Sequence, residues 1–229
     1  MKIVFLNTWN GKQKEDLVEY LAKEVKDTDI FCLQETLDIS RPLLADVLHD
    51  FKEVHAEKQA ERAMYGVSIY VKKGIAIHDT QSFFVENPKL GVAQHICIEK
   101  DGQMIDICNI HGITYHKDIK MDTPERLEQT EQILAFYKDR SYLRIIGGDY
   151  NILPEAQSIR AFPESGLRDL IMEYKIKTTR NHLCWDRYDG HKMYYSDYVF
   201  TSPEIEVTSF TVPETEASDH LPMVLEIKI

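Results

Sequence analysis

The sequence lacks any long hydrophobic run. Its longest apolar segments, such as residues 142–146, are short and interrupted, whereas a membrane-spanning helix needs about 20 apolar residues. Residues 1–7 form too short an apolar stretch for a signal peptide and contain no small-residue cleavage site. We therefore expect no integral-membrane segment and, by default, a cytoplasmic location.

Cysteine is scarce, with four residues in the chain: Cys32, Cys97, Cys108 and Cys184. Each lies in apolar or aromatic surroundings, with no C-x-x-C spacing and no nearby cluster of metal-type ligands. This pattern predicts reduced thiols within a core.

Basic residues are fewer than acidic ones. The chain has 27 Lys and Arg and 38 Asp and Glu, which gives a formal net charge of −11. Diffuse electrostatic attraction to nucleic acid needs a basic face, so a nucleic-acid partner stays open but is disfavoured. A phosphate substrate is not excluded. Carboxylates gathered around a divalent cation would themselves make a chain acidic.

The chain is long enough to bury a core without disulfides. It has 229 residues, of which 43% are hydrophobic and 28% charged, as in an ordinary globular protein. No fixed-period repeat, low-complexity segment or long linker divides it. We expect one domain over residues 1–229, and the oligomeric state is left open.

Hydrophobic periodicity predicts an α/β fold with two sheets covered by helices. Helical spacing of apolar residues predicts a helix over 16–25 and a second amphipathic stretch over 41–51. Thr123 as cap and Pro124 as first residue predict a long helix over 124–137. Short β-rich segments predict strands over 2–6, 29–33, 143–146, 196–201, 206–212 and 222–229, and a meander of antiparallel strands over 65–72, 75–85, 92–99 and 104–111.

Several predicted strands end in polar groups of related chemistry: Asn7, Glu35, His111, Asp149 with Asn151, and Asp219 with His220 before the last strand. If the strands are neighbours, these groups converge on one rim, where α/β folds place their sites. Carboxylate and amide oxygens are hard ligands that suit Mg²⁺ or Mn²⁺. Cysteine is absent from the set, which argues against a structural zinc site.

Seven short motifs follow one another along nearly the whole chain. They are Lys2-Ile-Val-Phe-Leu-Asn7, Leu33-Gln-Glu35, Tyr65-Gly-Val-Ser-Ile69, Asn109-Ile-His-Gly112, Gly148-Asp-Tyr-Asn151, Tyr195-Ser-Asp-Tyr-Val-Phe200 and Ser218-Asp-His220. In these motifs and in their order the chain resembles the endonuclease/exonuclease/phosphatase superfamily of metal-dependent phosphoesterases, and the ordered set is far more specific than any one motif alone. The resemblance implies a four-layer α-β-β-α sandwich, with two mixed β-sheets flanked by helices.

The resemblance also implies a Mg²⁺ site, with Mn²⁺ as a substitute. Glu35 matches the principal metal ligand, Asn7 lies beside it, and Asp219 matches a candidate second metal ligand. Asn10 is the alternative to Asn7 as the amide beside the metal ligand. A role in a turn at Asn10-Gly11 is the better explanation for Asn10, so we assign the position to Asn7.

Five residues match catalytic positions of the family. Asp149 and Asn151 match the pair that orients the attacking water and contacts the phosphoryl group, and His111 matches a phosphate-contacting position. Asp197 matches the acid that holds the catalytic histidine, His220. We expect Asp149 to accept the proton of the water, an effect worth about 10²–10⁴ in rate. We also expect Asp197 to raise the pKa of His220. Which residue is base and which is acid stays open.

Three more residues are candidates for binding substrate: Tyr115, Arg126 and Trp185. Tyr115 and Arg126 follow His111 and could reach a substrate phosphate, although Arg126 fits a solvated helix face equally well. Trp185 is the aromatic residue to test, with core or loop packing as the alternative.

Branches of the family act on abasic sites, DNA, RNA tails, tyrosyl adducts, sphingomyelin or inositol lipids. This chain departs from the abasic-site branch at Trp9, where an Asp is usual, and at His111, where a Tyr is usual. It also has no basic stretch interleaved with aromatics. We expect a Mg²⁺-dependent phosphoesterase, specifically a phosphodiesterase, with a nuclease as the alternative. A non-catalytic scaffold is the competing class, and no metal-binding or water-orienting position is visibly lost.

Overall fold

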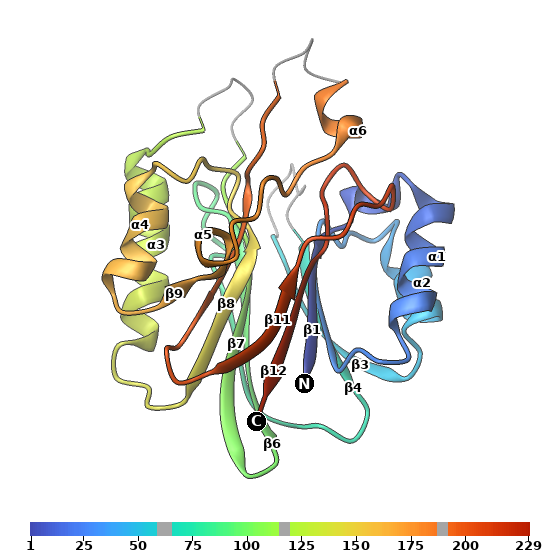
Figure 1. Ribbon diagram of the computed structural model, residues 1–229, viewed down its shortest axis with the longest axis horizontal. Coiled ribbons are helices and arrows are strands. Elements are labelled where there is room, and N and C mark those ends of the chain that lie inside the picture. The colour runs from blue at the N-terminus through green and yellow to red at the C-terminus, as the bar shows by residue number, and fades with distance from the viewer. Residues whose placement is uncertain (59–65, 115–119, 187–191) are drawn as a thin grey trace.

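The chain folds into two β-sheets packed face to face, with helices on the outer side of each sheet (Figure 1). The computed structural model describes residues 1–58, 66–114, 120–186 and 192–229. Helices α1 (Lys14–Glu24) and α2 (Arg41–Val47) cover one sheet, and α3 (Pro124–Tyr137) and α4 (Gln157–Glu164) cover the other. The expected four-layer α-β-β-α sandwich is confirmed.

Sheet A contains six strands in the order β11-β12-β1-β2-β4-β3. Its strands β1 and β2 run parallel, and the other neighbours pair antiparallel, so the sheet is mixed. The strands are β1 (Lys2–Asn7), β2 (Ile30–Gln34), β3 (Phe51–Glu57), β4 (Gly66–Lys72), β11 (Glu206–Thr211) and β12 (Met223–Lys228).

Sheet B also contains six strands, in the order β5-β6-β7-β8-β10-β9. Here β7 and β8 are the parallel pair. The strands are β5 (Ala76–Phe83), β6 (Val92–Lys100), β7 (Gln103–His111), β8 (Leu143–Asp149), β9 (Arg168–Asp169) and β10 (Asp197–Thr201). Three short elements complete the fold, the 3₁₀ turn η1 (Trp9–Gly11) and the helices α5 (Leu170–Glu173) and α6 (His182–Trp185).

Strand β1 shows how the sequence specifies the layers. Ile3 and Phe5 belong to the core between the two sheets, whereas Val4 and Leu6 pack with residues of α1 and α2. A strand covered on both faces is apolar at every position, because neither face meets water. The uninterrupted run Ile3-Val-Phe-Leu6 is therefore the sequence of a central strand.

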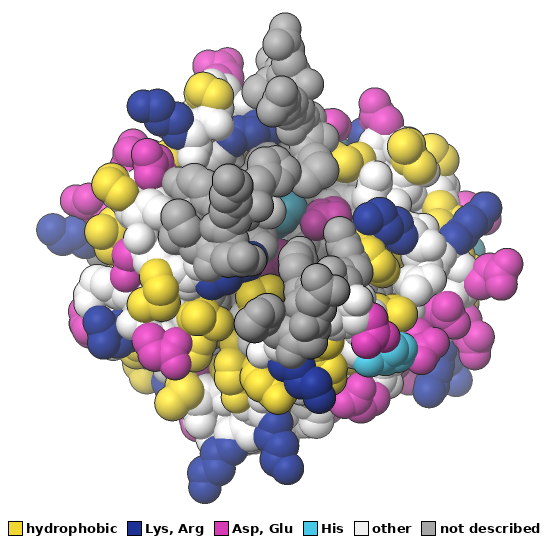
Figure 2. Space-filling model, turned by 90° about the horizontal axis from the view of Figure 1, so that it is seen from above, with side chains coloured by type: hydrophobic (Ala, Val, Ile, Leu, Met, Phe, Trp, Pro, Cys, Tyr) yellow, Lys and Arg dark blue, Asp and Glu magenta, His cyan; other side chains and the backbone are white. Residues whose placement is uncertain are grey.

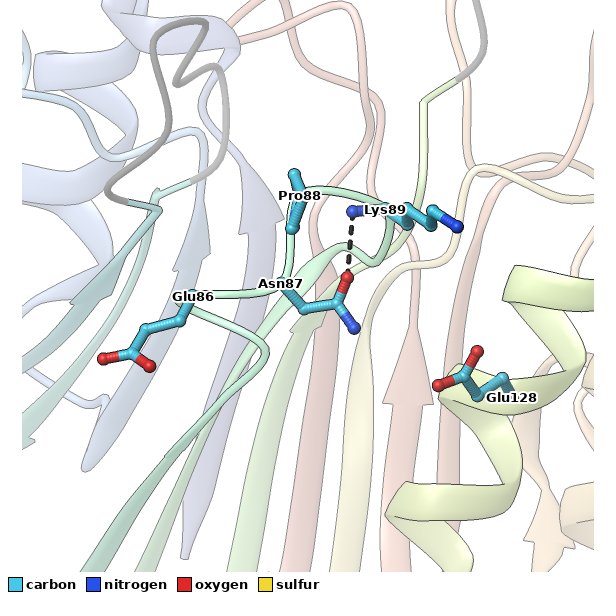
Figure 3. A pocket seen from close by; sticks show the side chains of 5 residues that line it. All are labelled: Glu86, Asn87, Pro88, Lys89 and Glu128. Carbon is cyan, nitrogen blue, oxygen red and sulfur yellow. Dashed lines mark hydrogen bonds between the residues drawn. The ribbon is translucent and has the colours of Figure 1, made fainter.

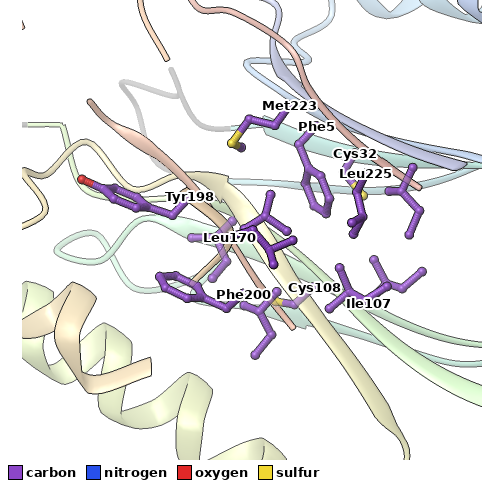
Figure 4. Packing of buried hydrophobic residues seen from close by; sticks show 14 of the residues in the cluster. Phe5, Cys32, Ile107, Cys108, Leu170, Tyr198, Phe200, Met223 and Leu225 are labelled. Carbon is purple, nitrogen blue, oxygen red and sulfur yellow. The ribbon is translucent and has the colours of Figure 1, made fainter. Parts of the chain in front are cut away.

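The core between the sheets is closely fitted around Phe5. Figure 4 shows Phe5 and Leu225 of sheet A with Cys108 and Phe200 of sheet B. A Cβ atom at Gly147 would lie 2.8 Å from Cε1 of Phe5. Since real Cβ atoms do not approach so closely, the Phe5 ring depends on a glycine opposite it.

Two of the predicted segments are corrected by the structure. The single antiparallel meander is wrong, because β4 pairs with β2 and β3 in sheet A, while β5, β6 and β7 lie in sheet B. Alternation of polar and apolar residues predicts a strand but does not identify its partner. The amphipathic stretch predicted over residues 41–51 is not one element. Helix α2 ends at Val47, and strand β3, which was not predicted, begins at Phe51.

Helix α3 has the predicted bounds. Thr123 caps it, with Oγ1 accepting a hydrogen bond from the backbone N–H of Arg126 at 3.3 Å, and Pro124 occupies the first turn. Neither α3 nor any other helix in the described ranges is long and apolar enough to cross a membrane. The cytoplasmic location stays a prediction.

Replacement of Phe5 tests the core between the sheets. We expect Phe5→Ala to lower the free energy of unfolding by about 3–5 kcal/mol, because it leaves a cavity between two rigid sheets. Urea unfolding followed by circular dichroism measures the change. Met172→Ala, at a side chain that is 66% exposed, is the control and should change stability by less than about 0.5 kcal/mol. Equal effects of the two substitutions would contradict this description of the core.

Candidate active site

The polar ends of the strands meet at one edge of the sandwich. In sheet A, the parallel strands β1 and β2 end together, which places Asn7 next to the residue after β2, Glu35. In sheet B, the parallel strands β7 and β8 end at His111 and Asp149, which are partners in register. Strand β10 runs antiparallel to β8 and begins at this edge, with Asp197 opposite Asp149.

Three other predicted site residues lie in loops at the same edge. Asn151 follows β8, and Asp219 and His220 precede β12, which runs antiparallel to β1. Figure 2 looks onto this edge and shows acidic and histidine side chains near its middle. The structure thus brings together all eight residues predicted as catalytic or metal-binding.

Asn7 joins the two sheets at this edge. Its side-chain amide donates hydrogen bonds to Oε1 of Glu35 at 3.2 Å and to Oδ2 of Asp149 at 3.0 Å. Its own Oδ1 accepts from the backbone N–H of Trp9 at 2.9 Å, which fixes the orientation of the amide. One amide group therefore holds carboxylates from different sheets beside each other.

The backbone at Glu35 is held in an unusual conformation. Its φ of 55° lies in the left-handed region, which non-glycine residues rarely adopt. The hydroxyl of Thr8 donates to the carbonyl groups of Gln34 at 3.0 Å and Glu35 at 3.3 Å, which secures the turn. Constraint of this kind is common where a side chain must point in one direction.

Asp149 is buried and firmly oriented. Asn151 donates to it twice, from its backbone N–H to Oδ1 at 2.8 Å and from its side chain to Oδ2 at 3.0 Å. The ring nitrogens Nε2 of His111 and His220 lie 3.9 Å and 3.7 Å from Oδ2 of Asp149. Asp149 is thus the centre around which both histidines are arranged.

Asp197 orients the ring of His220. Oδ1 of Asp197 lies 2.8 Å from Nδ1 of His220, and Oδ2 accepts from the hydroxyl groups of Thr179 at 2.8 Å and Ser196 at 2.7 Å. A carboxylate accepts at Nδ1 only if that nitrogen carries the proton, so Nε2 is left facing Asp149. The predicted pairing of Asp197 with His220 is present in the structure.

The carboxylates at this edge are short of positive charge. Burial raises the pKa of Glu35 to about 7, and the nearby Asp149 and Asp219 add to the rise. Burial likewise raises the pKa of Asp197 to about 6, even though Arg180 and two hydroxyl groups favour its charged form. A bound cation would relieve this accumulation of negative charge.

The expected rise in the pKa of His220 is wrong. Burial lowers the pKa of His220 to about 3, and Arg180 lowers it further, which outweighs the opposing effect of Asp149 and Asp219. Burial also lowers the pKa of His111. Burial thus favours the neutral form of both rings, because the desolvation of a charged imidazole outweighs its attraction to the surrounding carboxylates.

The donor groups around Glu35 fit a Mg²⁺ or Mn²⁺ ion. Carboxylate oxygens of Glu35 and Asp149 are brought together by Asn7, and hard cations bind through one or two carboxylates plus water and phosphate. Asp149, Asp197 and His220 also place one donor atom each within 4.8 Å of one another. However, Asp197 and His220 are hydrogen-bonded to each other, so the oxygens around Glu35 are the better site.

Two further polar residues at the site, Lys120 and Arg180, escaped prediction, and Arg180 contacts Cys184, which is free and buried as predicted. Lys120 Nζ donates to Oδ1 of Asn151 at 3.2 Å. Arg180 is 4% exposed and donates to Asp219 at 3.3 Å and to Sγ of Cys184 at 2.9 Å. Arg180 lies in the polar run Thr178-Thr-Arg-Asn181, a composition typical of a surface loop, so the sequence gives little sign of its burial.

Arg126 lies behind the site and ties loops together. Its guanidinium group donates to the carbonyl oxygens of Met121 at 2.6 Å, Ile113 at 3.0 Å and Asn151 at 2.9 Å. The residue is 4% exposed, so the alternative of a solvated helix face is wrong. Contact between Arg126 and a substrate stays a prediction.

The other two predicted substrate-binding residues stay untested. Trp185 lies at the end of α6, where Nε1 donates to the carbonyl of Met193 at 2.8 Å and the ring lies near Tyr194 and Lys192. Tyr115 lies outside the described residues. In the described part of the chain, no hydrogen bond, ion pair or ring contact joins Trp185 to the cluster around Asp149.

A hollow of about 570 Å³ lies near α3, separate from the carboxylate cluster (Figure 3). It is lined by Glu86, Asn87, Pro88 and Lys89 of the β5–β6 loop and by Glu128 of α3. None of the predicted site residues lines it. The residues predicted as catalytic or metal-binding therefore lie at the sheet edge and not in this hollow.

The raised pKa of Glu35 predicts how stability depends on pH without metal. Between pH 4.5, its ordinary pKa, and about 7, Glu35 binds a proton more strongly in the folded state than in the unfolded state, so the contribution of Glu35 to stability falls as pH rises. The difference corresponds to on the order of 3 kcal/mol. In EDTA, Glu35→Gln should remove this contribution, so that the slope of stability against pH in urea unfolding between pH 5 and 7 becomes more positive than the wild-type slope. The exposed control Glu19→Gln should keep it, and an unchanged slope in Glu35→Gln would contradict the assignment.

The fold is shared with several solved structures. An endonuclease/exonuclease/phosphatase from Bacteroides vulgatus is 17% identical, with a TM-score of 0.78, covering 100% of this chain and 98% of that one. A mannosyl-6-phosphatase from Bacteroides thetaiotaomicron is 18% identical, with a TM-score of 0.74 and full coverage of both chains. TDP2 from Caenorhabditis elegans is 17% identical, with a TM-score of 0.69, covering 99% of this chain and 74% of that one.

A search among curated proteins finds no significant match. The model of the Endonuclease/Exonuclease/phosphatase family, in contrast, matches residues 4–220. That span runs from β1 to His220 and so includes every strand end that contributes to the site. The chain belongs to the endonuclease/exonuclease/phosphatase family, whose members are phosphoester hydrolases.

Proposed function

We propose that the protein is a Mg²⁺-dependent phosphoesterase that hydrolyses a P–O bond by in-line attack of water. The observation that carries this proposal is the position of Asn7, which holds Glu35 and Asp149 together across the two sheets. The His220 ring, oriented by Asp197, faces the same carboxylate of Asp149. A cation site, an oriented carboxylate and oriented imidazoles are the groups that phosphoryl transfer requires.

Glu35 would hold the metal ion, with Asp149 beside it. Asn7 would position these two carboxylates, since its amide N–H groups face them and its Oδ1 faces Trp9, so coordination of the ion by Asn7 itself stays a prediction. When bound, the ion supplies Lewis-acid polarisation of the phosphoryl oxygens and stabilises the leaving oxygen. Mn²⁺ would substitute for Mg²⁺, because both are hard cations that accept oxygen ligands. The raised pKa of Glu35, caused by burial and by neighbouring carboxylates, supports a cation at this position.

Asp149 would accept the proton of the attacking water. A carboxylate has about four acceptor positions, and three are occupied by donors from Asn7 and Asn151, which leaves room for a water molecule. Those three bonds fix the direction of the free lone pair, and such positioning is a large part of catalysis. His111 and Asn151 would lie against the phosphoryl oxygens.

The substrate proposed is a small or accessible phosphoester, with a phosphodiester as the first candidate. The formal net charge of −11 repels polyanions at long range, which supports a small substrate over a nucleic acid. One structural neighbour is a mannosyl-6-phosphatase, so sugar phosphates are worth including among the compounds tested.

A panel of substrates tests the activity. With Mg²⁺ or Mn²⁺, we expect hydrolysis of bis-p-nitrophenyl phosphate or of one member of a set of sugar phosphates, inositol phosphates, sphingomyelin, DNA and RNA. EDTA and Glu35→Ala should each abolish it, because both remove the cation. Activity of Glu35→Ala equal to that of the wild type would refute the metal site, and selective cleavage of DNA or RNA would favour the nuclease alternative.

Replacement of Asp149 by its isosteric amide tests the general base. We expect Asp149→Asn to lower kcat by about 10²–10⁴, since an amide cannot accept the proton, with a much smaller change in Mg²⁺ affinity measured by calorimetry. Asp139→Asn, at an exposed position after α3, is the matched control and should leave kcat unchanged. Unchanged turnover in Asp149→Asn would exclude Asp149 as the base.

A further inference from the structure

Arg180 is a buried cation inside the proposed site. It lies in the segment before α6, which bridges to the loop before β12 through the pairing of Arg180 with His220. The backbone N–H of Leu221 also donates to the carbonyl of Thr179 at 2.8 Å. These contacts between distant parts of the chain place the Arg180 side chain against Asp219 and His220.

The guanidinium group of Arg180 contacts both members of this terminal pair. Nη2 lies 3.3 Å from Oδ2 of Asp219, and Nη1 contacts both ring nitrogens of His220. Nη1 also donates to Oγ of Ser196 at 3.3 Å, and Nη2 donates to Sγ of Cys184. Four partners around one planar group match arginine, which has five donors in a rigid arrangement, better than lysine.

The same space would be needed by a second metal ion. Nε2 of His220 lies 3.9 Å from Oδ1 of Asp219, a separation that one divalent cation could bridge. Arg180 is already in contact with both side chains, so its guanidinium fills the space beside them and its charge repels a further cation.

We propose that Arg180 takes the place of a second metal ion, so that the protein binds one divalent cation, at Glu35, and uses a fixed guanidinium to hold Asp219 and His220. This inference rests on the proposed function and specifies how that site is built. Because it acts through Asp219 and His220, Arg180 is a positioning residue.

Counting bound Mn²⁺ tests the inference independently of turnover. Mn²⁺ is titrated into the metal-free full chain, and the free ion is measured by its electron paramagnetic resonance signal. The wild type should bind one Mn²⁺ per chain. Arg180→Met should bind a second, weaker Mn²⁺, and adding Asp219→Asn to that variant should remove it. Arg168→Met, which breaks an ion pair with Glu173 at the surface, is the control and should bind one.

Turnover gives a second measurement. Arg180→Met should lower kcat by about 10²-fold through misplacement of His220, and Arg180→Lys should bind one Mn²⁺ with an intermediate kcat. Two Mn²⁺ ions on the wild type would overturn the inference, whether or not any variant folds. So would a folded Arg180→Met, checked by circular dichroism, that binds the same number as the wild type. Binding of no Mn²⁺ by the wild type would refute the proposed function itself.

Discussion

The structure depends on the hydrogen bonds that hold the edge of one sheet against the edge of the other. Each sheet contributes about half of the site, so the site exists only if the two edges are in register. Side-chain amides make these hydrogen bonds. Asn7 donates to carboxylates of both sheets, and beneath it Gln34 donates to Asn109 at 2.6 Å, while Asn109 donates to the carbonyl groups of Leu33 and Ser68. Amides suit this position because they donate and accept without adding charge.

Burial explains the electrostatics of the whole site. The same desolvation that raises the pKa of Glu35 and Asp197 lowers the pKa of His111 and His220, because in each case the neutral form is favoured. Without metal, the positive charge at this edge therefore resides on permanently charged side chains such as Arg180. A cation bound at Glu35 would favour the charged form of this carboxylate, which couples metal binding to its ionisation.

The sequence predicts those features whose cause is local. β1 and α3 follow from an apolar run and from a cap with an N-terminal proline, and Glu35 and Asp149 follow from short motifs at strand ends. The partner of β4 is not predictable in this way, since alternation is the same in either sheet. Arg180 is not predictable either, because its burial results from pairing with His220, 40 residues away.

The position of β12 has a consequence for synthesis of the protein. This strand lies between β11 and β1, so the first strand of sheet A gains its second neighbour only when β12, the last strand in the described order, has been synthesised. Until residues 223–228 leave the ribosome, β1 has an unpaired edge, and Asp219 and His220 have no strand to hold them at the site. A nascent chain therefore carries Glu35 and Asp149 without a working active site, and its exposed apolar strand edge makes chaperone binding useful during translation.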